Sequence, residues 1–154
     1  DVEGLIERIL KEAENERQVW EPLNRSARSG FQTDSTIFQV GESVEFLKTI
    51  IATEIDSYYS KFKTNDCSFV SLWPSEFNLR GWFVRLLQGG HQTAHIHPGG
   101  WLSGVVYLKV IQSPELNEGA IEFGLHGYNW PILDERHPRK IHQPQKGDIV
   151  LFPS

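Results

Sequence analysis

The sequence predicts a mainly β domain with helices at its N-terminus. Residues 1–62 contain two stretches in which apolar side chains recur at helical spacing, whereas after Lys63 the apolar repeat changes to two. Several short strands separated by Gly- and Pro-rich turns follow, with no long helix between them. This order is typical of antiparallel sheets, so we expect a β-sandwich or barrel supported by two helices rather than a parallel α/β sheet.

The length and the ends of the sequence indicate how many domains to expect and where they lie. A chain of 154 residues can bury one core without disulfide bonds, so we expect a single domain over 1–154. Its helical support should lie in 1–62 and its β core from about 66 to 154. The sequence contains no methionine and stops within a predicted strand. We therefore expect a piece of a longer chain, with the β core truncated at its C-terminal end.

Both predicted helices carry an apolar stripe between charged residues. In the first, within residues 1–20, the stripe consists of Val2, Leu5, Ile6, Ile9, Leu10 and Ala13. In the second it consists of Val44, Leu47, Ile51, Ile55, Tyr58, Tyr59 and Phe62. Ser43 is placed to cap the N-terminus of the second helix. The segment between the helices is rich in Ser, Asn, Gly and Pro, which predicts an ordered loop with a short strand at 36–40.

Four strand segments are predicted in the second half of the chain, at 76–88, 100–111, 119–125 and 147–152. In the first of them we expect two faces, one with Trp82, Val84 and Leu86 and the other with Phe83, Arg85 and Leu87. Residues 126–147 contain three prolines, which indicates a turn-rich insertion before the last strand.

Composition excludes several classes of function. The chain has 15 basic and 20 acidic residues, for a net charge of −5, so a nucleic-acid partner is not expected. No apolar run approaches the ~20 residues that cross a bilayer, and we expect a soluble protein of the cytoplasm without a membrane partner. The single cysteine, Cys67, cannot form an internal disulfide and is expected to be a small buried apolar residue. The sequence carries no signal of oligomeric state.

A histidine cluster, "HQTAHIHPGG" at 91–100, is the strongest candidate site. His95 and His97 flank Ile96, and strand alternation places both imidazoles on the same face, where they can bind one divalent ion. The alternative is a pair of surface or hydrogen-bonded strand histidines. Glycine and proline on both sides of the cluster allow sharp turns, as expected for a strand that opens onto a pocket. The other four histidines lack such paired spacing and are expected to face solvent; they are His91, His126, His137 and His142.

Several separated motifs occur in one order along the chain. The spacing Gly89-x5-His95-x-His97, followed by Gly147-x5-Pro153, resembles the paired motifs of cupins and their iron-dependent relatives. The glutamate that metal-binding cupins usually carry after H-x-H is absent here. The fuller pattern "HIHP", "SGVVYL", "GAIEF" and "GDIVLFPS" resembles the Fe(II)- and 2-oxoglutarate-dependent oxygenases, and "NRSARSGFQTDSTIF" is similar to their N-terminal segment. The resemblance implies a double-stranded β-helix (jelly-roll, cupin-like) core.

The resemblance also implies roles for individual residues. His95 takes the position of the first iron ligand, and His97 takes a position where most relatives have an acidic residue. Alternatively, His97 is not a ligand, and water or a remote carboxylate fills the position. Tyr107 matches a tyrosine that hydrogen-bonds 2-oxoglutarate in related prolyl hydroxylases, although a core aromatic is an equally open interpretation. The amide of Gln92 is a candidate contact for the cosubstrate or substrate.

The implied activity is a dioxygenase that hydroxylates an unidentified small-molecule or protein substrate and releases succinate and CO2. Its cofactors are Fe(II) and 2-oxoglutarate, with ascorbate as reductant. The third iron ligand and the basic residue that pairs 2-oxoglutarate are expected past Ser154. The alternative function is a non-catalytic cupin-like module that binds a metal or another ligand.

Overall fold

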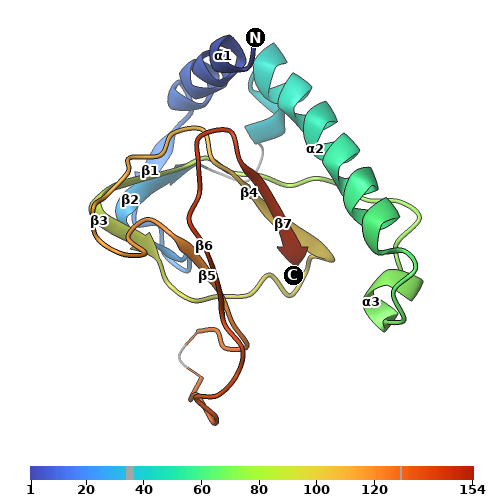
Figure 1. The fold of residues 1–154 in the computed structure, drawn as a ribbon. Helices are drawn as coiled ribbons and strands as arrows, with labels where there is room; N and C mark the ends of the chain where they lie inside the picture. Colours follow the sequence, from blue (N-terminus) through green and yellow to red (C-terminus); the bar gives the residue numbers. More distant parts are fainter. Residues whose placement is uncertain (34–36, 129) are drawn as a thin grey trace.

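The computed structural model describes residues 1–33, 37–128 and 130–154 of the chain (Figure 1). It contains the helices α1 (Val2–Glu14), α2 (Glu42–Phe62) and α3 (Ser68–Ser71) and the short 3-10 helix η1 (Ile37–Gln39). Within the described ranges there are seven strands: β1 (Gln18–Trp20), β2 (Ala27–Thr33), β3 (Val84–Gln92), β4 (Leu102–Val106), β5 (Ile121–Phe123), β6 (Lys140–His142) and β7 (Ile149–Pro153).

The strands form three antiparallel sheets. β1, β2 and β3 pair in that order, β4 pairs with β7, and β5 pairs with β6. Rings of Phe123 in β5 and Phe152 in β7 lie 4.9 Å apart and join the last two sheets. The predicted combination of N-terminal helices and antiparallel strands is confirmed, whereas the closed jelly-roll stays a prediction.

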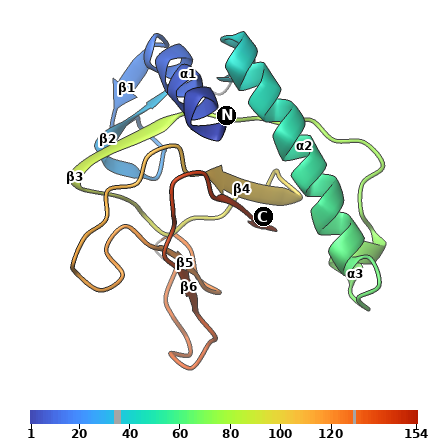
Figure 2. The ribbon, with the colours of Figure 1, turned by 45° about the horizontal axis from the view of Figure 1, so that its top comes forward.

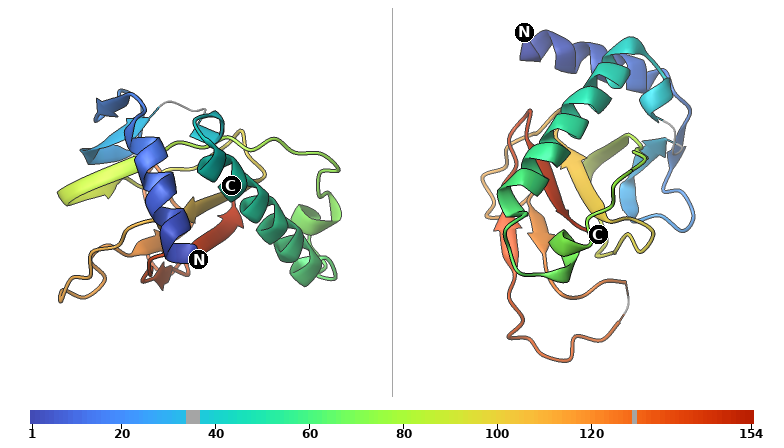
Figure 3. Two further views of the ribbon diagram at one scale, coloured as in Figure 1. Left: turned by 90° about the horizontal axis from the view of Figure 1, so that it is seen from above. Right: turned by 90° about the vertical axis from the view of Figure 1, so that its right-hand side faces the viewer.

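The main apolar core lies where the helices meet the strands. Its fully buried members are Ile9, Ala13, Ile37 and Val44. Phe83 next to β3 and Leu108 just past β4 pack against it, so both halves of the chain contribute. Figure 2 shows α1 and α2 on one side of the strands, and Figure 3 shows α2 running across β4 and β7. The connection between β5 and β6 projects away from the helices (Figure 1).

The start of α2 differs from the prediction. Its N-cap position is Gly41, and the side chain of Ser43 does not cap it. Instead, the carboxylate of Glu12 in α1 accepts hydrogen bonds from the backbone N–H groups of Ser43 (3.1 Å) and Val44 (2.9 Å). A Cβ on Gly41 would lie 2.4 Å from this carboxylate. Glycine at this position therefore leaves the space that the Glu12 carboxylate occupies. Burial raises the pKa of Glu12, but the two N–H donors outweigh it and hold the pKa below its usual value.

Several local predictions were wrong. The predicted strand at 36–40 is a 3-10 helix over Ile37–Gln39, and its first residue lies outside the described residues. β1 occupies the end of the stretch predicted as the first helix. The predicted loop contains β2, which pairs with the distant β3, and the predicted insertion contains β6. Burial does not alternate along β3, where Leu86 and Leu87 are 40% and 48% exposed. Cys67 is exposed, not buried.

None of the helices among the described residues combines the length and the apolar character that a membrane crossing requires.

Candidate metal centre

The histidine turn, residues 93–101, connects β3 to β4 and carries His95 and His97. Both imidazoles are half-buried, while Ile96 between them is 51% exposed. The two rings lie 4.9 Å apart between centroids and are tilted by 42°. Two imidazoles bound at right angles to one ion, at ~2.1 Å each, place their centroids about 4.5 Å apart. The observed centroid separation is close to this value.

The ring of His95 is fixed by its own turn. Its Nδ1 lies 2.6 Å from the backbone carbonyl oxygen of Thr93. A carbonyl oxygen only accepts hydrogen bonds, so Nδ1 carries the proton and donates it. In the neutral ring Nε2 is then unprotonated and presents the lone pair that a metal ion needs.

The ring of His97 is fixed by an aromatic neighbour. It stacks on the indole of Trp82 with a centroid distance of 5.7 Å and an interplanar angle of 7°. Burial lowers the pKa of His97, and the neighbouring charge of His95 lowers it further. The neutral imidazole is thereby favoured, which is the form that binds metal.

The connection between β5 and β6 holds the outer side of the histidine turn. Tyr128 donates its backbone N–H to the carbonyl of Ala94 (2.8 Å) and its hydroxyl to the carbonyl of Ile96 (3.1 Å). Gly127 is buried there, and a Cβ on it would lie 3.2 Å from Cγ2 of Ile96 and 3.5 Å from the carbonyl carbon of His95. The backbone on both sides of His95 is therefore held by a segment about 30 residues away in sequence.

The C-terminal end of β7 lies beside the same turn. Pro153 pairs with Leu102, and Ser154 donates its backbone N–H to the carbonyl of Trp101 (3.2 Å). A Cβ on Gly100 would lie 2.7 Å from Oγ of Ser154. Gly100 in turn donates its N–H to the carbonyl of His97 (2.9 Å), so the end of β7 is a direct neighbour of the histidine turn.

Among the described residues, the candidate metal centre offers two ligand atoms, one imidazole nitrogen each from His95 and His97. Nowhere in 1–33, 37–128 and 130–154 do three His, Cys, Asp or Glu side chains gather in a metal-binding arrangement. Imidazole suits ferrous iron, and two histidines are the nitrogen part of the facial set of non-haem iron oxygenases. His95 and His97 therefore fit part of such a centre.

The two predicted cosubstrate contacts lie at opposite ends of this region. Gln92 ends β3, and its amide oxygen accepts a hydrogen bond from the hydroxyl of Ser26 at 2.8 Å. Tyr107 directly follows β4 and is half-buried; burial raises the pKa of its phenol, and the charge of Asp148 raises it further. The phenol is therefore a neutral donor at physiological pH. Both proposed roles stay predictions.

The remaining histidines differ from one another. His91 is exposed as predicted. His142 is not simply solvent-facing, because its Nε2 lies 3.0 Å from the carboxylate of Asp148. The backbone N–H of Gln145 and then His142 lower the pKa of Asp148. This pair joins β6 to the start of β7.

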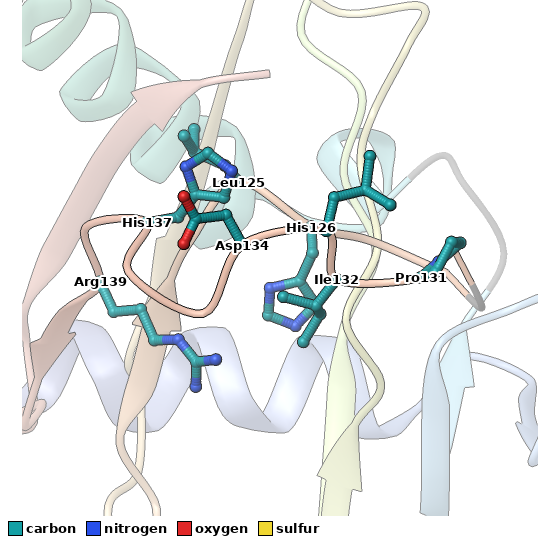
Figure 4. A pocket seen from close by; sticks show the side chains of 8 residues that line it. Leu125, His126, Pro131, Ile132, Asp134, His137 and Arg139 are labelled. Carbon is teal, nitrogen blue, oxygen red and sulfur yellow. The ribbon is translucent and has the colours of Figure 1, made fainter.

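A small cavity of about 140 Å³ lies within the connection between β5 and β6 (Figure 4). Its lining residues all come from this connection and include His126 and His137; they are Leu125, His126, Pro131, Ile132, Leu133, Asp134, His137 and Arg139. Neither His95 nor His97 lines it. The cavity is therefore separate from the candidate metal centre, and it is smaller than the ~300 Å³ of a typical ligand pocket.

Sequence reasoning missed the neighbours that orient the two histidines. Trp82 was predicted to lie on one face of a strand. Trp101 in the same region stacks on Phe69 at 5.7 Å and donates its Nε1–H to the backbone carbonyl of Phe69. No local spacing pairs Trp82 with His97. An aromatic residue kept among homologues just before the strand that leads to the H-x-H motif would be the signal for this contact.

A protein-family model described as "Putative 2OG-Fe(II) oxygenase" matches residues 80–154. The resemblance to this oxygenase family is confirmed. The matched oxygenase segment runs from just before β3 to the end of β7 and contains His95, His97 and Tyr107. The helices α1 and α2 and the strands β1 and β2 lie outside it. No curated protein and no solved structure matches the chain.

Proposed function

We propose that the protein is an Fe(II)- and 2-oxoglutarate-dependent dioxygenase that hydroxylates a small-molecule or protein substrate and releases succinate and CO2. The observation that carries this proposal is the pair of imidazoles 4.9 Å apart, one with a fixed tautomer, inside the oxygenase segment. In this proposal the sheets of the oxygenase segment are part of a double-stranded β-helix.

His95 and His97 are the proposed iron ligands, through the unprotonated Nε2 of His95 and a neutral imidazole of His97. Iron with bound 2-oxoglutarate supplies the oxidative decarboxylation. The chain's own residues hold the ligands: the Thr93 carbonyl keeps the His95 ring in one tautomer, and Trp82 covers one face of His97 and excludes water from it. Because His97 stands where an acidic ligand is usual, the site is one unit more positive and should bind the dianionic cosubstrate more tightly.

A third ligand and a basic residue for 2-oxoglutarate are proposed to follow Ser154. The position of β7 supports this, because its C-terminal end neighbours the histidine turn. Tyr107 is proposed to donate its phenol proton to a carboxylate of 2-oxoglutarate. Gln92 would have to exchange its bond to Ser26 for a bond to a ligand.

The experiment is a measurement of succinate released from 2-oxoglutarate by the full-length chain with Fe(II), ascorbate and a panel of candidate substrates. We expect slow release without substrate and faster release with the right one. His95→Ala should abolish both, because it removes a ligand. The matched control is His91→Ala, since His91 is exposed and should leave release unchanged. Equal succinate release by His95→Ala and the wild type would contradict the proposal.

The second candidate function is a non-catalytic cupin-like module that binds metal. The pair of imidazoles supports it, since metal binding alone requires no cosubstrate. Stoichiometric metal binding by the full-length chain without any 2-oxoglutarate turnover would select this function over the dioxygenase.

A further inference from the structure

The turn before β2 contacts the turn after β3. β2 and β3 pair antiparallel with Ala27 opposite Gln92, so the residue before Ala27 must meet the residue after Gln92. Ser26 accepts a hydrogen bond at its carbonyl from the N–H of Thr93 (3.0 Å), and its hydroxyl donates to Oε1 of Gln92 (2.8 Å). Thr93 is the residue whose carbonyl receives Nδ1–H of His95.

The neighbouring Arg25 reaches the second histidine by another route. Its guanidinium carbon lies 5.9 Å from the centroid of the Trp82 ring, and Trp82 is the ring that stacks on His97. A guanidinium over an indole is a favourable cation–π contact. Two consecutive residues thus connect to the two histidines through separate intermediates, Ser26 through Thr93 and Arg25 through Trp82.

The conformation of this turn is well determined by local contacts. The guanidinium of Arg28 donates to the backbone carbonyls of Arg25 (2.7 Å) and Ala27 (2.8 Å). Ala27 is fully buried at 0% exposure, and Asn24 adopts a positive φ of 61°, which asparagine tolerates better than most residues. The turn therefore presents Arg25 and Ser26 in one arrangement.

We propose that the Arg25–Ser26 turn is a positioning element of the metal centre. Ser26 holds Thr93 through its backbone carbonyl and the adjacent Gln92 through its hydroxyl, Thr93 in turn sets the tautomer of His95, and Arg25 holds Trp82 against His97. The turn lies outside the oxygenase segment, so this chain supports its ligands from its N-terminal part. The inference rests on the proposed function for the identity of the bound ion. Groups that orient metal-binding histidines are typically worth 10–100-fold in metal affinity, so the turn should affect binding without contacting the ion.

The first test needs no metal. In metal-free full-length protein with 15N-labelled histidine, long-range 1H–15N spectra report which ring nitrogen carries the proton. We expect His95 in the wild type to be the Nδ1–H tautomer. Ser26→Ala loses the bond to Gln92 but keeps the backbone bond to Thr93, so we expect a minor Nε2–H population to appear in this variant. We expect Arg25→Gln to shift the ring resonances of His97, because the stacked indole becomes mobile. Unchanged imidazole spectra in both variants would overturn the proposal.

Matched controls distinguish an effect on the orientation of His95 and His97 from the general effect of losing a charge or a hydroxyl group. Arg17→Gln and Ser60→Ala make the same chemical changes at exposed sites. Both should match the wild type in imidazole spectra and in thermal unfolding. Trp82→Phe keeps an aromatic ring against His97 and should retain most of the wild-type signature, whereas Trp82→Leu should lose it. Equal behaviour of Phe and Leu at this position would contradict the stacking role.

The second test uses Co(II) alone as the probe, followed by its visible absorption in the full-length protein. We expect affinity to fall about 10-fold in Trp82→Leu and Arg25→Gln, and about threefold in Ser26→Ala, which keeps the backbone bonds of the turn. Wild-type affinity in all three variants would overturn the inference, and so would the absence of Co(II) binding by the wild type. If the wild type releases no succinate but the variants still differ in Co(II) affinity as expected, the proposed dioxygenase function is wrong and the positioning role is supported.

Discussion

The helix pair and the histidine turn are held together by different kinds of contact. Ile9 of α1 and Val44 of α2 are 3% and 1% exposed in a dry apolar core. The histidine turn has little apolar burial. It is held by hydrogen bonds from the backbone N–H and hydroxyl of Tyr128, by the bond from the Thr93 N–H to the Ser26 carbonyl, and by a stacked indole. Apolar burial carries most folding free energy, whereas polar and aromatic contacts determine geometry. The two regions should therefore respond to mutation separately.

The largest expected effect on folding is in the helix pair. Ile9→Ala should lower the free energy of unfolding by about 2–4 kcal/mol, because it leaves a cavity between α1, η1 and α2. Urea unfolding measures this. Val2→Ala, at a position 69% exposed in the same helix, is the control and should change stability by less than about 0.5 kcal/mol. A similar loss in both variants would show that the helix packing is misassigned.

The second prediction concerns the histidine turn alone. His97→Ala should weaken Fe(II) binding by the full-length protein about 10–100-fold and leave urea unfolding unchanged, because His97 contributes little apolar burial. His97→Asp should retain or improve the affinity, since it places an anionic ligand at the proposed metal site. If Asp and Ala bind iron equally well, His97 is not a ligand.

A smaller effect is expected at the junction of the two helices. Gly41→Ala should cost about 1 kcal/mol, because the added Cβ displaces the Glu12 carboxylate from the N–H groups that it caps. Thermal unfolding of the variant tests this. In the Glu12→Gln background the same glycine substitution should cost less, since the strong cap is already lost; full additivity of the two substitutions would contradict the cap.

The smallest effect is a pH dependence of the same cap. The pKa of Glu12 is lower in the folded protein than in the unfolded chain, so its stabilising contribution is fully present above the unfolded value of about 4.3. It is lost as the pH falls through the folded value. Urea unfolding between pH 6 and pH 3 should show the stability gap between wild type and Glu12→Gln closing in acid. A constant gap would mean that the carboxylate is not the cap.

The comparison also explains what could be predicted from sequence. Helices α1 and α2 were predicted because their apolar stripes are local and periodic. β2, with the sequence ARSGFQT, has no such pattern and forms because it pairs with β3. The cap was assigned to Ser43, whereas Glu12 provides it from 31 residues away.

The same limit applies to the site. The H-x-H spacing and the separated motifs predicted that His95 and His97 lie side by side, although both lie in the turn after β3 and not in a strand. The contact between Ser26 and Gln92 spans 66 residues, and nothing in the local sequence of either residue encodes it. Motifs therefore predicted the candidate ligands, while the contacts that orient them required the fold.

The most direct measurement is an anaerobic Fe(II) titration of the full-length wild type, His95→Ala, His97→Ala and the double variant. Two ligands of one ion predict one tight Fe(II) per wild-type chain, large losses in each single variant, and little further loss in the double variant, because the effects of ligands that share one ion are not additive. Wild-type stoichiometry and affinity in His95→Ala would contradict the account.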